Sequence, residues 1–267
     1  MVTFVRIVAR IIDIHTHPIF FENEVSMKRI DRLVRHAKGL GVEKMVSLGD
    51  VLKFGPKPNA AQLRKLNDET HALMKRHPDF FIGFCYLNPL LGEKSLRTEL
   101  DRCVDGLGFK GIKLEIANNA SHPSMKPLMK AAEEKGIPVL QHTWATQHQR
   151  MRKTHSDAID TCGLARRHPN TRVIMAHLFG IGHRGVLEAI GLDNLVVDTS
   201  SCLPFAGLVE FACEKLGADR VLYGSDLPIR ELSACIARVT AADIPDSAIP
   251  KILYDNAARW LGLGGTN

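Results

Sequence analysis

Short apolar runs alternate with longer amphipathic segments along this chain of 267 residues. The runs are rich in Val, Ile, Leu and Phe, which favour strands, whereas the segments between them have the apolar spacing of helices. No low-complexity stretch or obvious linker interrupts the alternation, so we expect one domain over residues 1–267. Eight strands that alternate with helices close economically into a (β/α)8 TIM barrel, an α/β fold. The predicted strands are Val8–Ile14, Lys44–Leu48, Phe80–Tyr86, Gly108–Leu114, Ile137–Gln141, Arg172–Ala176, Leu195–Asp198 and Arg220–Tyr223.

Several of the intervening segments carry helix boundaries. Gly39 and Gly136 follow two of them, and the pairs His77-Pro78 and His168-Pro169 are natural helix stops. We therefore interpret the histidines of these two pairs as structural. The predicted helices include Glu24–Lys38, Ala60–Arg76, Gly92–Asp105, Ser124–Lys135 and Ser156–Arg167.

The composition is that of an ordinary globular protein, with 45% hydrophobic and 24% charged residues. No apolar run reaches transmembrane length, so a membrane protein is not expected. The segment Val5–Ile14 is interrupted by Arg6 and Arg10 and leads into a histidine pair, which predicts a strand and not a signal peptide. A cytoplasmic location is the resulting expectation.

The six cysteines are scattered, without a Cys-x-x-Cys pair, and are expected to be reduced thiols. The formal charge of +6 is spread along the chain, so it indicates a solvated surface more than a nucleic-acid site. The local exception is Arg150, Arg152 and Lys153, which follow His142. This group can attract a carboxylate or phosphate if it borders the site, or it is one exposed helical turn.

The first predicted strand ends in a His-x-His pair. Side chains two apart in a strand point to the same side, so His15 and His17 can offer two imidazoles to one metal ion. Barrel enzymes gather their active sites at the carboxyl ends of the strands, and further polar residues stand at such exits. For any one histidine a core position satisfied by a backbone carbonyl is the alternative, but the regular placement predicts a shared metal site. These further residues are Lys113 in the fourth strand, His142 after the fifth, His177 after the sixth and Asp226 after the eighth.

These motifs and their order resemble the amidohydrolase superfamily, and more narrowly its amidohydrolase-related branch, called amidohydrolase 2. Each fragment is common by itself, whereas the order and spacing are specific. The matching fragments are Asp13-Ile14-His15-Thr16-His17, Gly111-Ile112-Lys113-Leu114, Val139-Leu140-Gln141-His142, Ile174-Met175-Ala176-His177, Tyr223-Gly224-Ser225-Asp226-Leu227-Pro228 and the closing segment Ile252–Leu263.

The resemblance implies one divalent metal ion, most often zinc, held by His15, His17, His142 and Asp226. Neutral imidazoles and a carboxylate suit zinc and leave room for water or substrate, and manganese would also fit. Such an ion lowers the pKa of bound water towards roughly 7, and Asp226 can then accept the proton. By the same resemblance, His177 lies beside the metal and polarises the substrate or moves protons.

Two further residues are expected at the site, Asp13 from its place on the strand and Lys113 from the resemblance. Asp13 would share the side of the histidine pair and is expected to hydrogen-bond a ligand, with direct ligation as the alternative. Lys113 corresponds to a position that is carboxylated in binuclear relatives. Here we expect an unmodified Lys113 that binds a substrate carboxylate, with an ion pair to Glu115 as the alternative.

The reaction predicted first is hydrolysis of a small, carboxylated, anionic substrate by metal-activated water. Decarboxylation by the same site is the near alternative, with Asp226 or His177 delivering a proton to carbon. A TatD-like metal-dependent nuclease is a more distant one, because the eighth strand here carries Gly-Ser-Asp in place of Glu-Thr-Asp. A non-catalytic, metal-retaining barrel is least favoured because no expected residue is missing.

The substrate itself is not encoded in any motif, and no nucleotide-binding glycine motif indicates an organic cofactor. Specificity should depend on the strand-to-helix loops, where Trp144 can stack on a planar substrate or simply pack. His148 and His155 are interpreted as exposed loop residues. A homodimer is a further expectation, since dimers are common in similar barrels. The four loops are Gly49–Asn59, Ala117–Pro123, Trp144–His155 and Ser200–Pro204.

Overall fold

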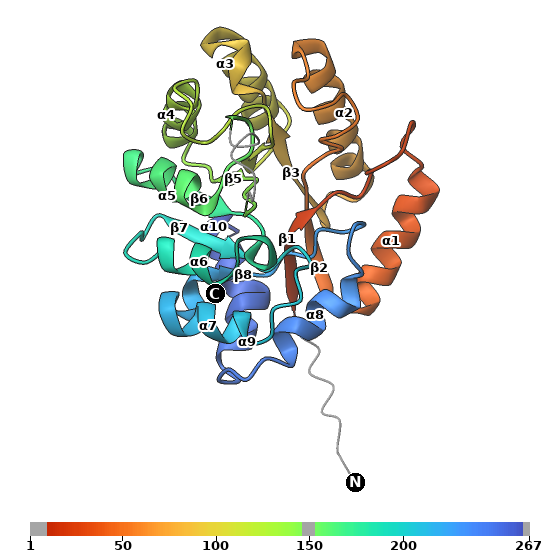
Figure 1. The fold of residues 1–267 in the computed structure, drawn as a ribbon. Coiled ribbons are helices and arrows are strands. Elements are labelled where there is room, and N and C mark those ends of the chain that lie inside the picture. The colour runs from red at the N-terminus through yellow and green to blue at the C-terminus, as the bar shows by residue number, and fades with distance from the viewer. Residues whose placement is uncertain (1–9, 146–152, 264–267) are drawn as a thin grey trace.

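Eight parallel strands form one sheet in which each strand pairs with its neighbours in chain order. The computed structural model describes residues 10–145 and 153–263. The colours in Figure 1 pass around the strands from red to blue, with the helices outside them. The structure therefore confirms the predicted (β/α)8 barrel. The strands are β1 Ile11–Thr16, β2 Val42–Ser47, β3 Phe81–Tyr86, β4 Gly111–Leu114, β5 Val139–Gln141, β6 Val173–Met175, β7 Leu195–Asp198 and β8 Val221–Leu222.

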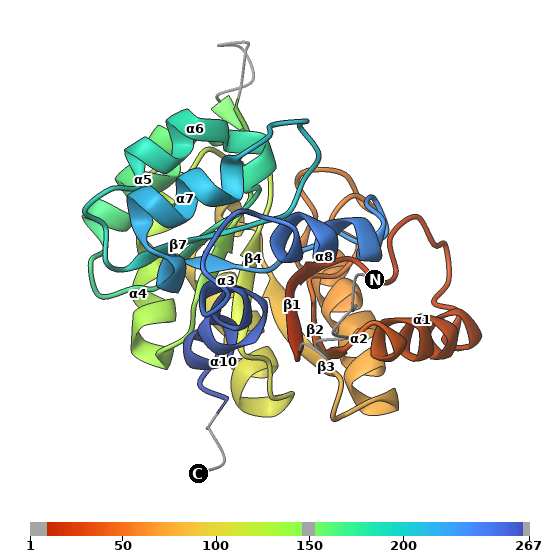
Figure 2. The same ribbon diagram turned by 90° about the horizontal axis from the view of Figure 1, so that it is seen from below.

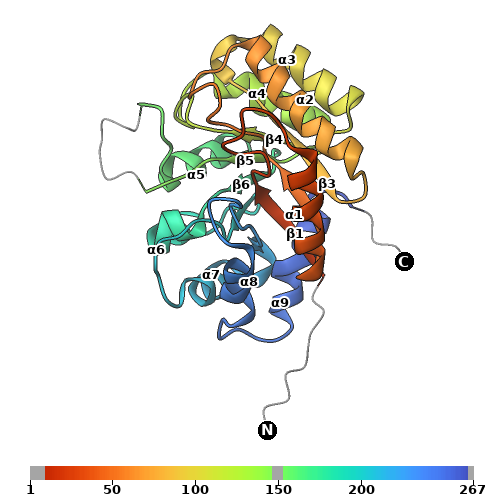
Figure 3. The same cartoon turned by 90° about the vertical axis from the view of Figure 1, so that its right-hand side faces the viewer.

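The helices form the outer ring. In Figures 2 and 3, α5, α6 and α7 lie together on one side of the strands, apart from α1 and α2. The α-helices of the described residues are α1 Met27–Gly39, α2 Ala60–Arg76, α3 Glu93–Asp101, α4 Met125–Lys135, α5 Ala158–Arg167, α6 Leu178–Glu188, α7 Leu208–Leu216, α8 Leu232–Thr240, α9 Ala248–Pro250 and α10 Asn256–Trp260. None of them is long and apolar enough to cross a membrane.

The barrel closes between β8 and β1. The backbone N–H of Ile14 donates to the carbonyl of Tyr223 at 3.0 Å, and the N–H of Asp226 donates to the carbonyl of His15 at 2.8 Å. The regular part of β8 is only two residues long, shorter than predicted, because the N–H of Tyr223 donates to Ile252 and not to a strand. Closure therefore brings Asp226 beside the histidine pair.

The apolar residues form two layers. Ile11 belongs to the layer between strands and helices, whereas Ile12 and Ile14 belong to the barrel interior, as strand alternation requires. Trp260 of α10 packs against this interior cluster. Full burial of each such aliphatic side chain stabilises the fold by roughly 1.5–3 kcal/mol. Apolar side chains fill the barrel interior, and Trp260 packs against them. The polar residues lie at the carboxyl ends of the strands.

Element boundaries differ from the prediction at a few places. β1 continues through His15 to Thr16, because Thr16 pairs with Ser47 across a register shift that follows Asp13. Helix α3 ends at Asp101 and continues as a π-helical turn, Arg102–Gly106. Helix α2 has the predicted bounds, because Asn59 and Gln62 form a capping box at its start.

Candidate metal centre

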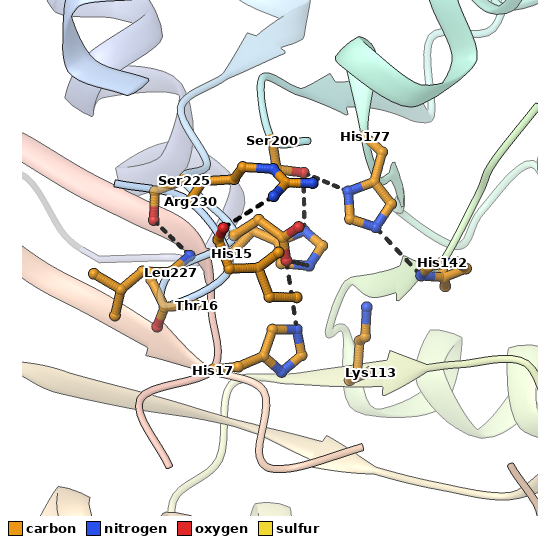
Figure 4. Close-up of polar contacts among 12 residues, drawn as sticks. His15, Thr16, His17, Lys113, His142, His177, Ser200, Ser225, Leu227 and Arg230 are labelled. Carbon is orange, nitrogen blue, oxygen red and sulfur yellow. Dashed lines mark hydrogen bonds and ion pairs between the residues drawn. The ribbon is translucent and has the colours of Figure 1, made fainter. Parts of the chain in front are cut away.

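The histidines and acid predicted from the strand exits lie together at one end of the barrel. His15 lies on β1 and His17 directly after it, His142 follows β5, His177 precedes α6, and Asp226 follows β8. Figure 4 shows the four imidazoles around one space, with the side chain of Lys113 reaching up from β4. The barrel thus brings residues from four separate parts of the sequence into one cluster.

Three side chains bring ligand atoms close enough for one ion. His15, His17 and Asp226 each offer an atom within 4.8 Å of the other two. Oδ1 of Asp226 lies 3.7 Å from Nε2 of His15 and 4.0 Å from Nε2 of His17. His142 is not part of this triad. Its Nδ1 lies 3.2 Å from Nε2 of His177 and 3.0 Å from Oε1 of Glu115.

The Nδ1 atoms of the candidate ligands are engaged elsewhere, which determines the atom left for a metal. Nδ1 of His15 donates to Oδ2 of Asp198 at 2.9 Å, and Nδ1 of His17 donates to the carbonyl of Gly49 at 2.7 Å. Nδ1 of His142 faces Glu115. In each ring the lone pair is therefore on Nε2, the arrangement that outer hydrogen bonds impose on metal-binding histidines.

Burial keeps these imidazoles neutral. Desolvation lowers the pKa of His17 and of His142 to about 4, and it lowers the pKa of His15 and of His177 well below the usual 6.5. Burial also raises the pKa of Asp226 to about 7, against the opposing charge of Lys113. The histidines are thus in the form that binds metal, and Asp226 is poised to exchange a proton near neutral pH.

Asp198 is a member of the cluster that sequence reasoning missed. Besides His15, it accepts hydrogen bonds from the backbone N–H of His177 at 3.1 Å and of Ser200 at 3.0 Å. The Ser200 hydroxyl in turn contacts Nδ1 of His177 at 2.8 Å. Asp198 ends the seventh predicted strand, so its position at a strand exit was the signal that could have identified it.

The structure places Asp13 against backbone and not against a histidine ring. Its Oδ1 accepts from the N–H of His15 at 3.2 Å and from the N–H of Ser225 at 3.0 Å. These bonds join β1 to the segment after β8. Asp13 therefore supports the backbone that carries His15 and Asp226.

Lys113 is completely buried and lies 3.2 Å from Oε2 of Glu115. Its Nζ has no hydrogen-bond partner among the described residues. Burial raises the pKa of Glu115, but the neighbouring His142 and the charge of Lys113 lower it more, so the net shift is downward. The ion pair with Glu115, the alternative expected for Lys113, is thus present. The N–H donors of Nζ have no hydrogen-bond acceptor among the described residues.

A cavity of about 290 Å³ opens over the cluster. Trp144 forms part of its wall, and its ring lies edge-on to His177 at 5.7 Å between centroids. Gly180 makes room for this ring, because a Cβ there would lie 2.7 Å from it. Arg230, a second residue that sequence reasoning missed, also borders the cavity. The lining residues are His17, Phe20, Val51, Leu52, Glu115, Ile116, His142, Trp144, His155, His177, Asp226, Ile229 and Arg230.

Of the basic group Arg150, Arg152 and Lys153, the structure describes only Lys153. Lys153 is exposed and does not line the cavity. Arg150, Arg152 and His148 lie outside the described residues. A larger hollow of about 580 Å³, between α2 and α3, contains none of the clustered histidines.

The cluster fits a divalent metal ion. Nε2 of His15 is buried and has no hydrogen-bond partner within the described residues, which costs free energy unless another group uses its lone pair. A metal ion close to Asp226 would use it. Neutral imidazole nitrogens with one carboxylate suit zinc or manganese.

Solved structures share this fold at low sequence identity. The crystal structure of 2,6-dihydroxybenzoate decarboxylase from Rhizobium is 19% identical, with a TM-score of 0.78 over 96% of this chain and 100% of that chain. A dihydroxybenzoic acid decarboxylase from Polaromonas sp. JS666, solved with bound manganese and an inhibitor, is 16% identical, with a TM-score of 0.73 over 96% and 97%. These similarities show the fold.

Sequence comparison gives the family. Gamma-resorcylate decarboxylase from Rhizobium radiobacter is 24% identical in an alignment that covers 76% of this chain and 76% of that protein. The amidohydrolase family model matches residues 12–263. Because this match spans nearly all of the sequence, the chain belongs to the amidohydrolase family, as its motifs indicate.

Proposed function

We propose that this enzyme is a metal-dependent decarboxylase of a small aromatic carboxylate. The proposal depends on Nε2 of His15, which is buried, faces Asp226 and has no hydrogen-bond partner within the described residues. The curated relatives of this chain are gamma-resorcylate decarboxylases. Hydrolysis was the first expectation from sequence. The relatives favour the alternative reaction, although the same donors would also suit water activation.

The triad of His15, His17 and Asp226 would hold the metal, for which manganese and zinc are the candidates. His142, the fourth ligand expected from the sequence, lies beside the triad against His177 and Glu115 and would complete the set. When bound, the ion would supply positive charge that orients the substrate carboxylate and a neighbouring oxygen. Asp198 and the carbonyl of Gly49 keep two of the imidazoles in the required tautomer. The cavity of about 290 Å³ is of a size for one substituted ring.

Asp226 is the proposed proton donor. In the site without metal, burial raises its pKa to about 7, which favours a protonated carboxyl group near neutral pH. The ring carbon takes this proton, and the bond from that carbon to the carboxylate breaks. The electron pair of the broken bond stays with the ring, carbon dioxide leaves, and Asp226 regains a proton from solvent. His177, neutral and hydrogen-bonded to Ser200, would hold the substrate oxygen opposite.

The nuclease alternative receives less support from the site. A second metal ion would need a further acidic ligand, and Glu115, the acid nearest to His142, lies 3.2 Å from Lys113 and 3.0 Å from His142. These contacts leave it less available as a ligand for a second metal ion.

The test is a product assay on metal-loaded protein. Wild type reconstituted with Mn²⁺ or Zn²⁺ is incubated with dihydroxybenzoates and, separately, with aromatic lactones and amides. We expect carbon dioxide and the decarboxylated phenol in equal amounts, and loss of both in Asp226→Asn. Asp246→Asn, the same change at an exposed acid, is the matched control and should retain activity. Hydrolysis of a lactone or amide without release of carbon dioxide from any acid would refute the proposal.

A further inference from the structure

Arg230 lies on the rim of the cavity, four residues after Asp226. Its backbone N–H donates to the carbonyl of Asp226 at 3.3 Å, so the two residues belong to one turn. It borders the same cavity as Trp144 and His177. Figure 4 shows its side chain extending from the Ser225 side towards Ser200. The guanidinium is thus placed at the site and not on the outer surface.

The guanidinium has few partners for its five N–H donors. One nitrogen donates to the carbonyl of Ile229 at 2.9 Å, and another contacts the sulfur of Cys202. Nε is buried and without a partner among the described residues, and no ion pair within that part of the chain involves Arg230. By contrast, Arg184 donates twice to Asp157, at 2.6 and 2.7 Å. Arg230 is therefore a partly buried cation that forms no ion pair with the described residues, although its charge reaches Asp226 and lowers the pKa of that carboxyl group.

The contact with Cys202 nevertheless orients the side chain of Arg230. Cys202 lies on the segment that follows β7, two residues after Ser200, which contacts His177, and four after Asp198, the last residue of β7, which contacts His15. Arg238 donates to the carbonyl of Ser201 from the outside, so the segment is supported next to Cys202. The Cys202 contact thus places Arg230 relative to the histidine cluster.

A partly buried cation lacking an anionic partner costs free energy, and a bound anion offsets that cost. A guanidinium matches the two oxygens of a carboxylate with parallel hydrogen bonds. The carboxylate that reacts would be oriented at the metal centre and Asp226. Arg230 is then free to bind a different group.

We propose that Arg230 is a specificity-determining residue that binds a second acidic oxygen group on the substrate ring, a carboxylate or an acidic phenol oxygen. The statement that the first carboxylate is the one lost rests on the proposed function, whereas recognition of the second group does not. The substrate class is therefore an aromatic acid with two acidic oxygen groups, preferred over the corresponding acid with one.

Calorimetric titration in the presence of Mn²⁺ tests this with three probes: benzoate, isophthalate and meta-hydroxybenzoate. Wild type should bind isophthalate or meta-hydroxybenzoate at least about tenfold more tightly than benzoate, as one charge-assisted pair can supply. Arg230→Met should remove that preference and leave the benzoate affinity within about twofold, since benzoate lacks the second group. The probe that loses affinity shows whether the second group is a carboxylate or a phenol oxygen.

Two variants complete the design. Arg35→Met removes an equal charge from an exposed position on α1 and should keep the preference. Arg230→Lys should keep part of it. No preference in wild type, a preference retained in Arg230→Met, or equal weakening of all three probes would each refute the assignment. An enzyme that shows the Arg230-dependent preference but releases no carbon dioxide would support this inference and refute decarboxylation.

Discussion

Oδ2 of Asp198 accepts a hydrogen bond from Nδ1 of His15 at 2.9 Å, and both side chains are completely buried. This contact orients the ring so that Nε2 lies 3.7 Å from Oδ1 of Asp226. Asp198 is not a member of the triad of His15, His17 and Asp226. It nevertheless determines which nitrogen of His15 can face a metal.

Asp198→Asn should weaken metal binding without removing a predicted ligand. The amide retains an acceptor oxygen but loses the negative charge that holds His15 and raises its basicity. We expect the Kd for Zn²⁺ to rise about 10–100-fold, measured by competition with a chelator. His15→Ala is the comparison and should abolish stoichiometric binding. An unchanged Kd in Asp198→Asn would show that the contact does not support the centre.

His177→Asn should separate chemistry from metal binding. His177 contacts Ser200 and His142, and sequence reasoning assigns it to the substrate rather than to the ion. We expect nearly full metal content, by elemental analysis, with turnover reduced at least about 100-fold. If metal content and turnover fall together, His177 is a ligand.

Lys113→Met should raise the KM for carboxylated substrates about tenfold, because it removes a buried positive charge beneath the cluster. The measurement is steady-state kinetics together with the unfolding midpoint. Lys153→Met is the control, since neither lysine lines the cavity and only Lys113 is buried beneath the cluster. Unaltered kinetics with a lower midpoint would show that Lys113 serves only its ion pair with Glu115.

Gly180→Ala should displace the Trp144 ring, since the added Cβ would lie 2.7 Å from it. We expect the affinity for aromatic acids to fall about tenfold or more, with a changed tryptophan emission spectrum. At Gly106 an added Cβ meets no atom within 4 Å, so Gly106→Ala is a matched control. Equal affinities in both variants would argue against an aromatic wall at Trp144.

The metal-free protein should lose stability as the pH falls from about 6.5 towards 5. Burial lowers the pKa of His17 and His142 to about 4, and lowers that of His15 and His177 further, so in this range the unfolded chain binds protons that the folded chain excludes. The raised pKa values of Asp13 and Asp226, about 7 each, act in the opposite direction, but four histidines outnumber two carboxyl groups.

Urea unfolding of the chelator-treated protein measures this dependence. His142→Gln should reduce the slope of the unfolding free energy against pH by up to about 1.4 kcal/mol per pH unit. His36→Gln, at an exposed position on α1, should leave the slope unchanged. Constant or increasing stability on acidification would contradict the assigned burial of the histidines.

The sequence by itself determined the barrel and most of the cluster. The alternation of strand and helix patterns is a local property that can be followed along the chain. Because sites in such barrels form at strand exits, the positions of His15, His17, His142, His177 and Asp226 along the chain were enough to predict that they meet. The bounds of helix α2 agree with the prediction, whose helix stop at His77-Pro78 is also a local signal.

Tertiary structure alone decided the contacts that give the cluster its chemistry. The hydrogen bond between His15 and Asp198 joins residues 183 apart in the sequence, and the contact of Arg230 with Cys202 joins residues 28 apart. Both depend on the register of neighbouring strands and on the paths of the loops that follow them, neither of which is encoded in a local apolar period. That packing determines the orientation of each imidazole and the ion pair of Lys113. It also places Arg230 where no described residue forms an ion pair with it.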